Sequence, residues 1–147
     1  MARVSQTLAA HDVPPARLCL ELTESVFMGD LAVVGETMAR LHRTGVQFSI
    51  DDFGTGYSSL SYLSQLPFNE LKIDQSFTRT LLQDAGSRSI ALAILAMSHS
   101  MGLRTLAEGV ETIEQRDFLA ANGCEAFQGY LPGRPMPLAE FEKTFMS

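Results

Sequence analysis

The fold of this chain is decided by residues 46–60, whose sequence is VQFSIDDFGTGYSSL. The apolar run over 46–50 predicts a buried strand, and it leads directly into two adjacent acidic residues, Asp51 and Asp52. The glycines that follow, Gly54 and Gly56, allow a positive φ or a close approach of the backbone. Two adjacent carboxylates repel each other, so their place between an apolar strand and Phe53 indicates a functional site.

The same order of strand and then helix recurs along the chain. We predict strands over 18–22, 46–50, 71–73, 103–107 and 126–128, and helices over 31–44, 60–66, 87–101, 112–122 and 138–145. Such alternation is typical of parallel strands joined by right-handed crossovers. The 147 residues give about 29 to each of five units, close to the ~31 of a (β/α)8 barrel. The predicted fold class is therefore α/β, either a partial TIM-like (β/α)8 barrel with about five of eight units or an open doubly wound sheet.

The composition is that of a globular chain, with 46% hydrophobic and 19% charged residues. The longest apolar run, over 90–97, is far shorter than the ~20 residues that cross a bilayer, so we expect no membrane segment and a soluble, cytoplasmic chain. A net charge of −6 without a basic block argues against a nucleic acid polymer as partner. Cys19 and Cys124 form no CxxC pair and are expected to be free, buried thiols, and three scattered histidines argue against zinc.

A charged or amide side chain lies at the end of every predicted strand: Glu21, Asp51 with Asp52, Lys72, Glu108 and Gln128. In both architectures the carboxyl ends of parallel strands meet at one rim, where active sites are built. A single glutamate at such a place is more often merely solvated, and Glu24 and Glu111 can equally belong to the first turns of helices. Lys72, between Leu71 and Ile73, would be a costly inward charge without a carboxylate or phosphate beside it.

The acidic residues of this rim offer only oxygen ligands, which favours Mg²⁺ or Mn²⁺ over zinc. Six acids are assigned to it: Glu21, Glu24, Asp51, Asp52, Glu108 and Glu111. Without these six, the 17 acidic residues become 11, equal to the 11 Lys and Arg, so the net negative charge can be assigned to the rim. Two divalent ions bound there can hold an anionic phosphate ester that bare carboxylates would repel.

Five segments together resemble the EAL domain family, bacterial phosphodiesterases of cyclic di-GMP. They are ELTES at 21–25, DDFGTGYSSL at 51–60, LKID at 71–74, AEGVET at 107–112 and QGY at 128–130, and they follow the family's order and spacing. The resemblance implies a (β/α)8-like barrel of which residues 1–147 are the truncated C-terminal part, with the last five strands. It also implies a two-ion site for Mg²⁺ or Mn²⁺, cyclic di-GMP as the small-molecule partner and its hydrolysis to linear pGpG.

The resemblance assigns a role to each matched residue. The metal ligands would be Glu21, Asp51, Asp52 and Glu108, with Asp52 serving the second ion. The catalytic residues would be Lys72, in contact with the attacking water or the phosphate, and Glu108, the candidate base. The residues that support the loop and the site would be Glu24, Gly54, Gly56 and Glu111. Gln128 would hydrogen-bond within the substrate or water network.

Two departures from the family pattern limit the expected activity. The sequence lacks the Glu-Ala-Leu motif that names the family and an upstream metal-binding Asn, both of which belong to N-terminal strands, and Pro132 stands where an aromatic residue is common. Without those strands we expect open sheet edges and an exposed apolar barrel interior. The chain alone would then have little activity, and it would need the missing N-terminal segment, a partner chain or a homodimer.

Two other functions stay open at this stage. The same rim can belong to a catalytically inactive module that binds cyclic di-GMP or regulates a partner protein. A phospho-acceptor receiver domain would also combine an acidic pair with a strand-borne lysine, but its pair would follow the first strand and its lysine the last. Here the pair follows the second predicted strand and Lys72 lies in the third, which argues against a receiver domain.

Overall fold

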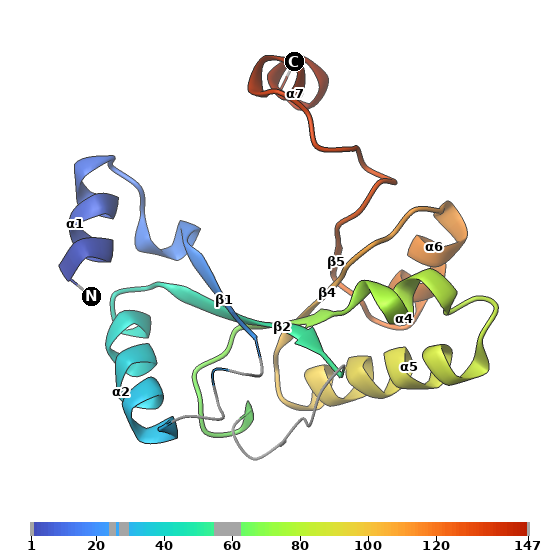
Figure 1. Cartoon of the computed structure of the whole chain (residues 1–147), viewed down its shortest axis with the longest axis horizontal. Coiled ribbons are helices and arrows are strands. Elements are labelled where there is room, and N and C mark those ends of the chain that lie inside the picture. Colours follow the sequence, from blue (N-terminus) through green and yellow to red (C-terminus); the bar gives the residue numbers. More distant parts are fainter. Residues whose placement is uncertain (1, 24–25, 27–29, 55–62, 147) are drawn as a thin grey trace.

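A computed structural model describes residues 2–23, 26, 30–54 and 63–146 of the chain (Figure 1). Its strands are β1 Cys19–Thr23, β2 Gln47–Phe53, β3 Glu70–Ile73, β4 Arg104–Ala107 and β5 Ala126–Phe127. Its helices are α1 Ala2–Ala10, α2 Leu31–His42, α4 Gln75–Thr80, α5 Ala85–Ser100, α6 Ile113–Ala121 and α7 Leu138–Phe145, with a 3₁₀ turn, η1, at Pro15–Arg17. Within these ranges, no helix has both the length and the apolar character that a bilayer crossing requires.

The predicted strands and the helices predicted over 31–44, 87–101, 112–122 and 138–145 are confirmed, with small differences at their ends. The helix predicted over 60–66 lies partly outside the described residues. Helices α1 and α4 were not predicted. The start of α4 does carry a recognisable pattern, because the Asp74 carboxylate accepts a hydrogen bond from the Ser76 backbone N–H, 2.9 Å away, and caps the helix.

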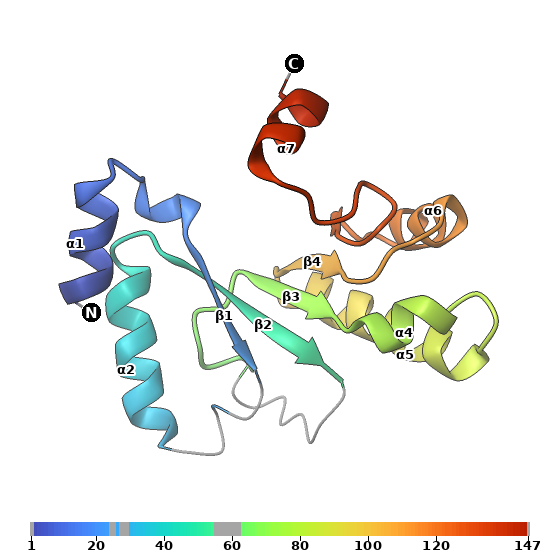
Figure 2. The ribbon, with the colours of Figure 1, turned by 45° about the horizontal axis from the view of Figure 1, so that its top comes forward.

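All five strands pair in parallel and in the order of the sequence, β1-β2-β3-β4-β5. A doubly wound sheet reverses its strand order at a switch point, whereas a (β/α)8 barrel places each new strand beside the preceding one. The sheet is therefore a partial barrel, and the doubly wound alternative is wrong. Because all strands run the same way, their carboxyl ends lie at one rim (Figure 2).

One face of the sheet forms the hydrophobic core with the helices. Phe48 and Ile50 of β2 and Leu71 and Ile73 of β3 are each at most 2% exposed. The helical residues of the same core cluster are Met38 and Leu41 of α2, Ile94 and Leu95 of α5 and Leu119 of α6. This core holds the central strands in a fixed register, and the side chains at their carboxyl ends are placed with them.

The opposite face of the sheet is largely polar, which corrects the expectation of an exposed apolar interior. Glu21 pairs with Ser49, Ser49 with Glu70 and Glu70 with Arg104, so these four side chains share a face. The Arg104 guanidinium lies 3.0 Å from the Glu70 carboxylate. A charged face of this kind does not need to be covered by apolar side chains, although the strands β1 and β5 remain at the edges of the described sheet.

The two cysteines are free, as predicted, but neither is fully buried. Cys19 is exposed because it lies on β1, an edge strand, and its alternate residues face away from the core. Cys124 is partly buried beside β4 and β5. The prediction of two buried thiols is therefore wrong for Cys19.

A β-bulge interrupts the pairing of β2 and β3 at the acidic pair. Ile50 pairs with Leu71 and Phe53 with Ile73, so β2 has one residue more than β3 over this interval. Asp52 has a φ of +54°, the left-handed conformation that side-chain-bearing residues rarely adopt. The extra residue breaks the strict alternation of the strand, and Asp51 and Asp52 can therefore turn toward the same side.

We predict that glycine is better tolerated than alanine at this bulge. Both Asp52→Gly and Asp52→Ala remove the carboxylate, but only glycine adopts a positive φ without steric cost. The free energy of unfolding of Asp52→Gly should exceed that of Asp52→Ala by about 1 kcal/mol in chemical denaturation with a metal chelator present. The same two substitutions at Ser49, which has regular strand conformation, should give the opposite order of stability. If the alanine variant is the more stable one at both positions, the result would contradict the bulge.

Candidate metal-binding site

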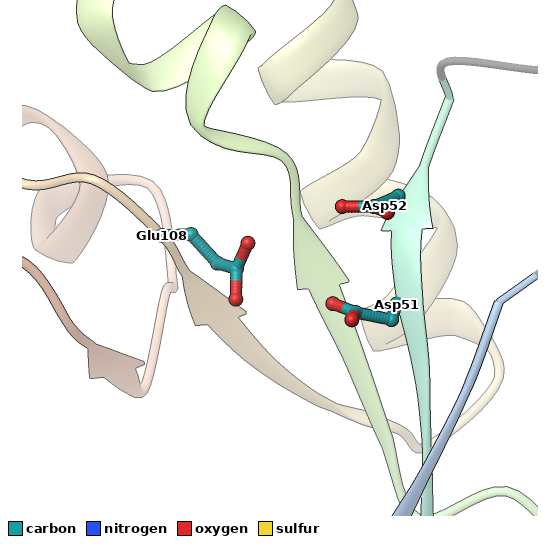
Figure 3. Close-up of side chains that lie close together, drawn as sticks. All are labelled: Asp51, Asp52 and Glu108. Carbon is teal, nitrogen blue, oxygen red and sulfur yellow. The ribbon is translucent and has the colours of Figure 1, made fainter.

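Three carboxylates converge at the rim of the sheet. Asp51 and Asp52 at the end of β2 and Glu108 just after β4 point toward one another across β3 (Figure 3). Each contributes one carboxylate oxygen to a group in which these oxygens lie within 4.8 Å of one another. We call this group the carboxylate cluster. The bulge lets the adjacent residues Asp51 and Asp52 both belong to the cluster, and the register of the sheet places Glu108 beside them.

Lys72 lies at the centre of the rim and binds three carboxylates. Its ammonium nitrogen is 2.7 Å from Glu108 Oε1, 2.8 Å from Asp51 Oδ1 and 3.1 Å from Glu21 Oε2. The Lys72 side chain is only 4% exposed, whereas Glu21 is 53%, Asp51 22% and Glu108 15% exposed. A buried ammonium requires such partners, and of the carboxylate or phosphate predicted beside Lys72 the structure shows carboxylates.

The electrostatic environment changes the acidity of two of these groups. Burial alone would lower the pKa of Lys72, but hydrogen bonds to Asp51, Glu108 and Glu21 outweigh it and raise the pKa, so Lys72 is an ammonium ion at neutral pH. The pKa of Asp52 is raised by desolvation and then by the negative charges of Asp51 and Asp74. A raised carboxyl pKa indicates that a cation beside Asp52 would be favourable.

Glu108 is held from both sides. Its backbone N–H donates to the Ile73 carbonyl at 3.0 Å, which places it at the end of β3, and Gln128 Nε2 donates to Glu108 Oε1 at 2.6 Å. The neighbouring Gly129 permits this arrangement, because a Cβ there would collide with the backbone N and O of Val110. The glycine of the QGY segment thus lets the chain after β5 pack against the loop that carries Glu108.

The other predicted site residues are placed less centrally. Glu21 reaches Lys72 but is not a member of the carboxylate cluster. Glu111 faces Arg79, with Oε1 3.8 Å from Nε, and no contact with the cluster is observed for it within the described residues. Gly54 has a φ of +95°, as its predicted loop role requires. Glu24 and Gly56 lie outside the described residues.

A cavity of about 870 Å³ adjoins Glu108 and was not predicted from the sequence. Its polar lining includes Gln75, Arg79, Glu108, Glu111, Gln128 and Arg134, and its apolar lining includes Phe127, Tyr130, Leu138, Phe141 and Phe145. The apolar part comes partly from α7, which lies apart from the helices that flank the sheet (Figures 1 and 2). The helical spacing of Leu138, Phe141 and Phe145 is a sequence signal from which this apolar helix face could have been predicted.

The residues of the carboxylate cluster fit a hard divalent cation. They supply only oxygen donors from three separate carboxyl groups, and their oxygens are close enough together to bind one ion. The side chains are partly exposed, which leaves room for water or substrate oxygens in the remaining coordination positions. This donor set is unsuited to the thiolate and imidazole coordination that zinc prefers.

Comparison with known proteins agrees with the fold and identifies the family of the chain. The model of the EAL domain family matches residues 1–135. The bifunctional diguanylate cyclase/cyclic di-GMP phosphodiesterase MucR of Pseudomonas aeruginosa is 47% identical over 134 residues, which are 91% of this chain and 20% of MucR. The chain thus spans about a fifth of the length of the curated relatives it matches.

Two solved structures are similar to most of the chain. The MucR phosphodiesterase in complex with cyclic di-GMP has a TM-score of 0.88 and 46% identity, over 94% of this chain and 56% of that one. The manganese and cyclic di-GMP complex of Klebsiella pneumoniae BlrP1 has a TM-score of 0.81 and 28% identity, over 88% of this chain and 33% of that one. The family match over most of the sequence and this structural agreement show that the chain belongs to the EAL domain family.

Proposed function

We propose that this chain is the catalytic-rim portion of a cyclic di-GMP phosphodiesterase, which hydrolyses one phosphodiester bond to give linear pGpG. The observation that carries the proposal is the convergence of Asp51, Asp52 and Glu108 beside the buried Lys72 ammonium. One relative supports the choice of substrate twice, because MucR is named a bifunctional diguanylate cyclase/cyclic di-GMP phosphodiesterase and its phosphodiesterase is solved in complex with cyclic di-GMP.

The metal ions we propose are Mg²⁺ or Mn²⁺, two of them in the complete domain, with Asp51, Asp52, Glu108 and Glu21 as ligands. Bound there, they would supply an activated water and stabilise the leaving oxygen of an in-line displacement. Support comes from the all-oxygen donor set and from the manganese in the BlrP1 complex. Glu21, which is exposed and outside the carboxylate cluster, has the weakest geometric support of the four.

Residues of the chain itself would accept the proton from water and stabilise the charge on the phosphate. Glu108 is within hydrogen-bond distance of Lys72 and Gln128, so its carboxylate is oriented to accept a proton from the attacking water. Lys72 would add a fixed positive charge beside the phosphate as negative charge develops on its oxygens. Gln128 holds the Glu108 carboxylate through Oε1, and we propose Glu24, Gly54, Gly56 and Glu111 as supporting residues.

We further propose that the chain is the C-terminal part of its domain and is weakly active alone. The described sheet has β1 and β5 at its edges, and the chain covers 56% of the MucR phosphodiesterase chain to which it is similar. The N-terminal strands with the Glu-Ala-Leu motif, supplied by a preceding segment or a partner chain, would complete the set of ligands. The free cysteines suit a reducing compartment, and we propose a cytoplasmic location.

A catalytically inactive module that binds cyclic di-GMP is the second candidate. The observation in its favour is that, among the described residues, three carboxylates converge and Lys72 already neutralises part of their charge. Calorimetry with cyclic di-GMP separates the two functions. Binding in the presence of a chelator, without turnover in Mn²⁺, would favour the module.

We predict that metal binding depends on the rim acids and not on acidic residues elsewhere. Asp51→Ala should abolish Mn²⁺ binding in calorimetry because it removes a member of the carboxylate cluster, and Glu21→Ala should also abolish it if Glu21 is a ligand. Glu114→Ala, on the exposed surface of α6, is the matched control and should bind Mn²⁺ as the unchanged chain does. Equal behaviour of all three variants would contradict the assignment of the rim.

Mn²⁺ affinity should fall as the pH is lowered, and Asp52 should contribute to this dependence. The pKa of Asp52 is raised, so a proton competes with the metal at a higher pH than at an ordinary aspartate. Its charge is present above that pKa and is lost as the pH falls through it, which weakens binding on the acid side. Asp52→Asn should therefore bind Mn²⁺ more weakly, and its Mn²⁺ affinity should change less between pH 4 and 7. If its affinity depends on pH as steeply as that of the unchanged chain, Asp52 does not contribute to the dependence.

Phosphodiesterase activity should require completion of the barrel. The chain alone, with Mn²⁺ and cyclic di-GMP, should produce pGpG far more slowly than a fusion to the N-terminal strands of the MucR phosphodiesterase domain. Lys72→Met in that fusion is the inactive control. Turnover by the chain alone near that of the fusion would overturn the proposed incompleteness, and an inactive fusion that folds would overturn the proposed activity. Light scattering on the same samples tests the homodimer implied by the family resemblance.

A further inference from the structure

The Lys72 ammonium and a bound divalent ion would share the same carboxylates. Lys72 contacts Asp51 and Glu108, two of the three members of the carboxylate cluster, and also Glu21. These three partners use all three N–H donors of the ammonium group. The lysine is thus fully engaged with the residues that would hold the metal.

The charges at the rim are only partly balanced by this lysine. Glu21, Asp51, Asp52 and Glu108 carry four negative charges when ionised, and Lys72 contributes one positive charge. Replacing Lys72 by a neutral side chain would leave the carboxylates facing one another without a cation, and their mutual repulsion would destabilise the folded chain. The ammonium therefore holds these side chains close to one another.

The same contacts oppose the entry of another cation. Glu108 Oε1 accepts hydrogen bonds from both Lys72 and Gln128, at 2.7 and 2.6 Å, so both of its lone pairs are used. A divalent ion would have to use the other oxygen of Glu108, and it would lie within a few ångströms of the Lys72 ammonium. The two positive charges would repel each other while they competed for the same anions.

We propose that Lys72 is a built-in counter-cation that preorganises the carboxylate cluster and also weakens the binding of a divalent metal to it. This inference rests on the metal site of the proposed function and adds to the role of Lys72 beside the phosphate. As a positioning residue, Lys72 makes the rim stable without metal. As a competing charge, it keeps the carboxylate cluster from binding a divalent ion as tightly as its three carboxylates alone would.

The test measures Mn²⁺ affinity by calorimetry and thermal unfolding with and without a chelator. Lys72→Met keeps the length of the side chain and removes its charge. In the chelator its melting temperature should fall below that of the unchanged chain. Its Mn²⁺ affinity should rise by about tenfold or more, because a repulsion between a single and a double positive charge is removed. The addition of Mn²⁺ should therefore raise the melting temperature of Lys72→Met by more than it raises that of the unchanged chain.

Arg104→Met is the matched control. It removes a positive charge from the same face of the sheet, but Arg104 is 65% exposed and pairs with Glu70 rather than with the carboxylate cluster. Its Mn²⁺ affinity should stay within about twofold of the unchanged chain, because exposed charges are screened by solvent. Lys72→Gln is the second variant for the case that Lys72→Met does not fold, since its amide still donates hydrogen bonds without the charge.

The outcomes separate this inference from the proposed function. Tighter Mn²⁺ binding by the Lys72 variants, with Arg104→Met unchanged, supports the inference. Binding by the unchanged chain with equal or weaker binding by folded Lys72 variants overturns the inference and leaves the metal site standing. Absence of binding by every variant overturns the proposed metal site, and the inference with it.

Discussion

The Lys72 ammonium, nearly excluded from solvent, binds carboxylates from β1, from β2 and from the loop after β4. An ammonium buried to this degree is stable only with anionic partners, and carboxylates this close together are stable only with a cation. Each therefore requires the other. The position of β3 between β2 and β4 supplies this contact, because the parallel register places Lys72 between the acidic ends of its neighbours.

Backbone geometry decides how many carboxylates reach that centre. In a regular strand, adjacent residues face opposite sides of the sheet, and Asp51 and Asp52 would be divided between the core and the rim. The bulge between Ile50 and Phe53 and the positive φ of Asp52 remove this constraint. The site thus depends on a local departure from strand geometry, held in place by the buried residues on either side of it.

The face of the sheet opposite the helical core is largely polar. Glu70, Arg104, Lys72 and Ser49 share this face, so the described strands do not present the continuous apolar surface expected of an open barrel interior. Glu21 places a charged side chain on the edge strand β1, where it opposes edge-to-edge pairing with another chain. The apolar residues of α7 and Phe127 lie elsewhere, where they border the cavity beside Glu108.

The amino-acid sequence by itself determined the alternation of strands and helices and the presence of polar residues at every strand end. It did so because hydrophobic periodicity and helix caps are local properties: Thr112 forms the capping box of α6 with Gln115, and Gly45, Gly102 and Gly123 adopt the positive φ of helix ends. It also predicted that Lys72 needs a carboxylate or a phosphate beside it, since a charge within an apolar strand is costly to bury without an anionic partner.

Only the tertiary structure decided which carboxylates meet. Strand order distinguished a partial barrel from a doubly wound sheet, and both had been compatible with the same pattern. Register, a bulge and contacts between distant segments determine the remaining features. They bring Asp51, Asp52 and Glu108 together, place Glu111 away from them, expose Cys19 and form the cavity beside α7. These are long-range relations, and a pattern of neighbouring residues carries no record of the distance across a sheet.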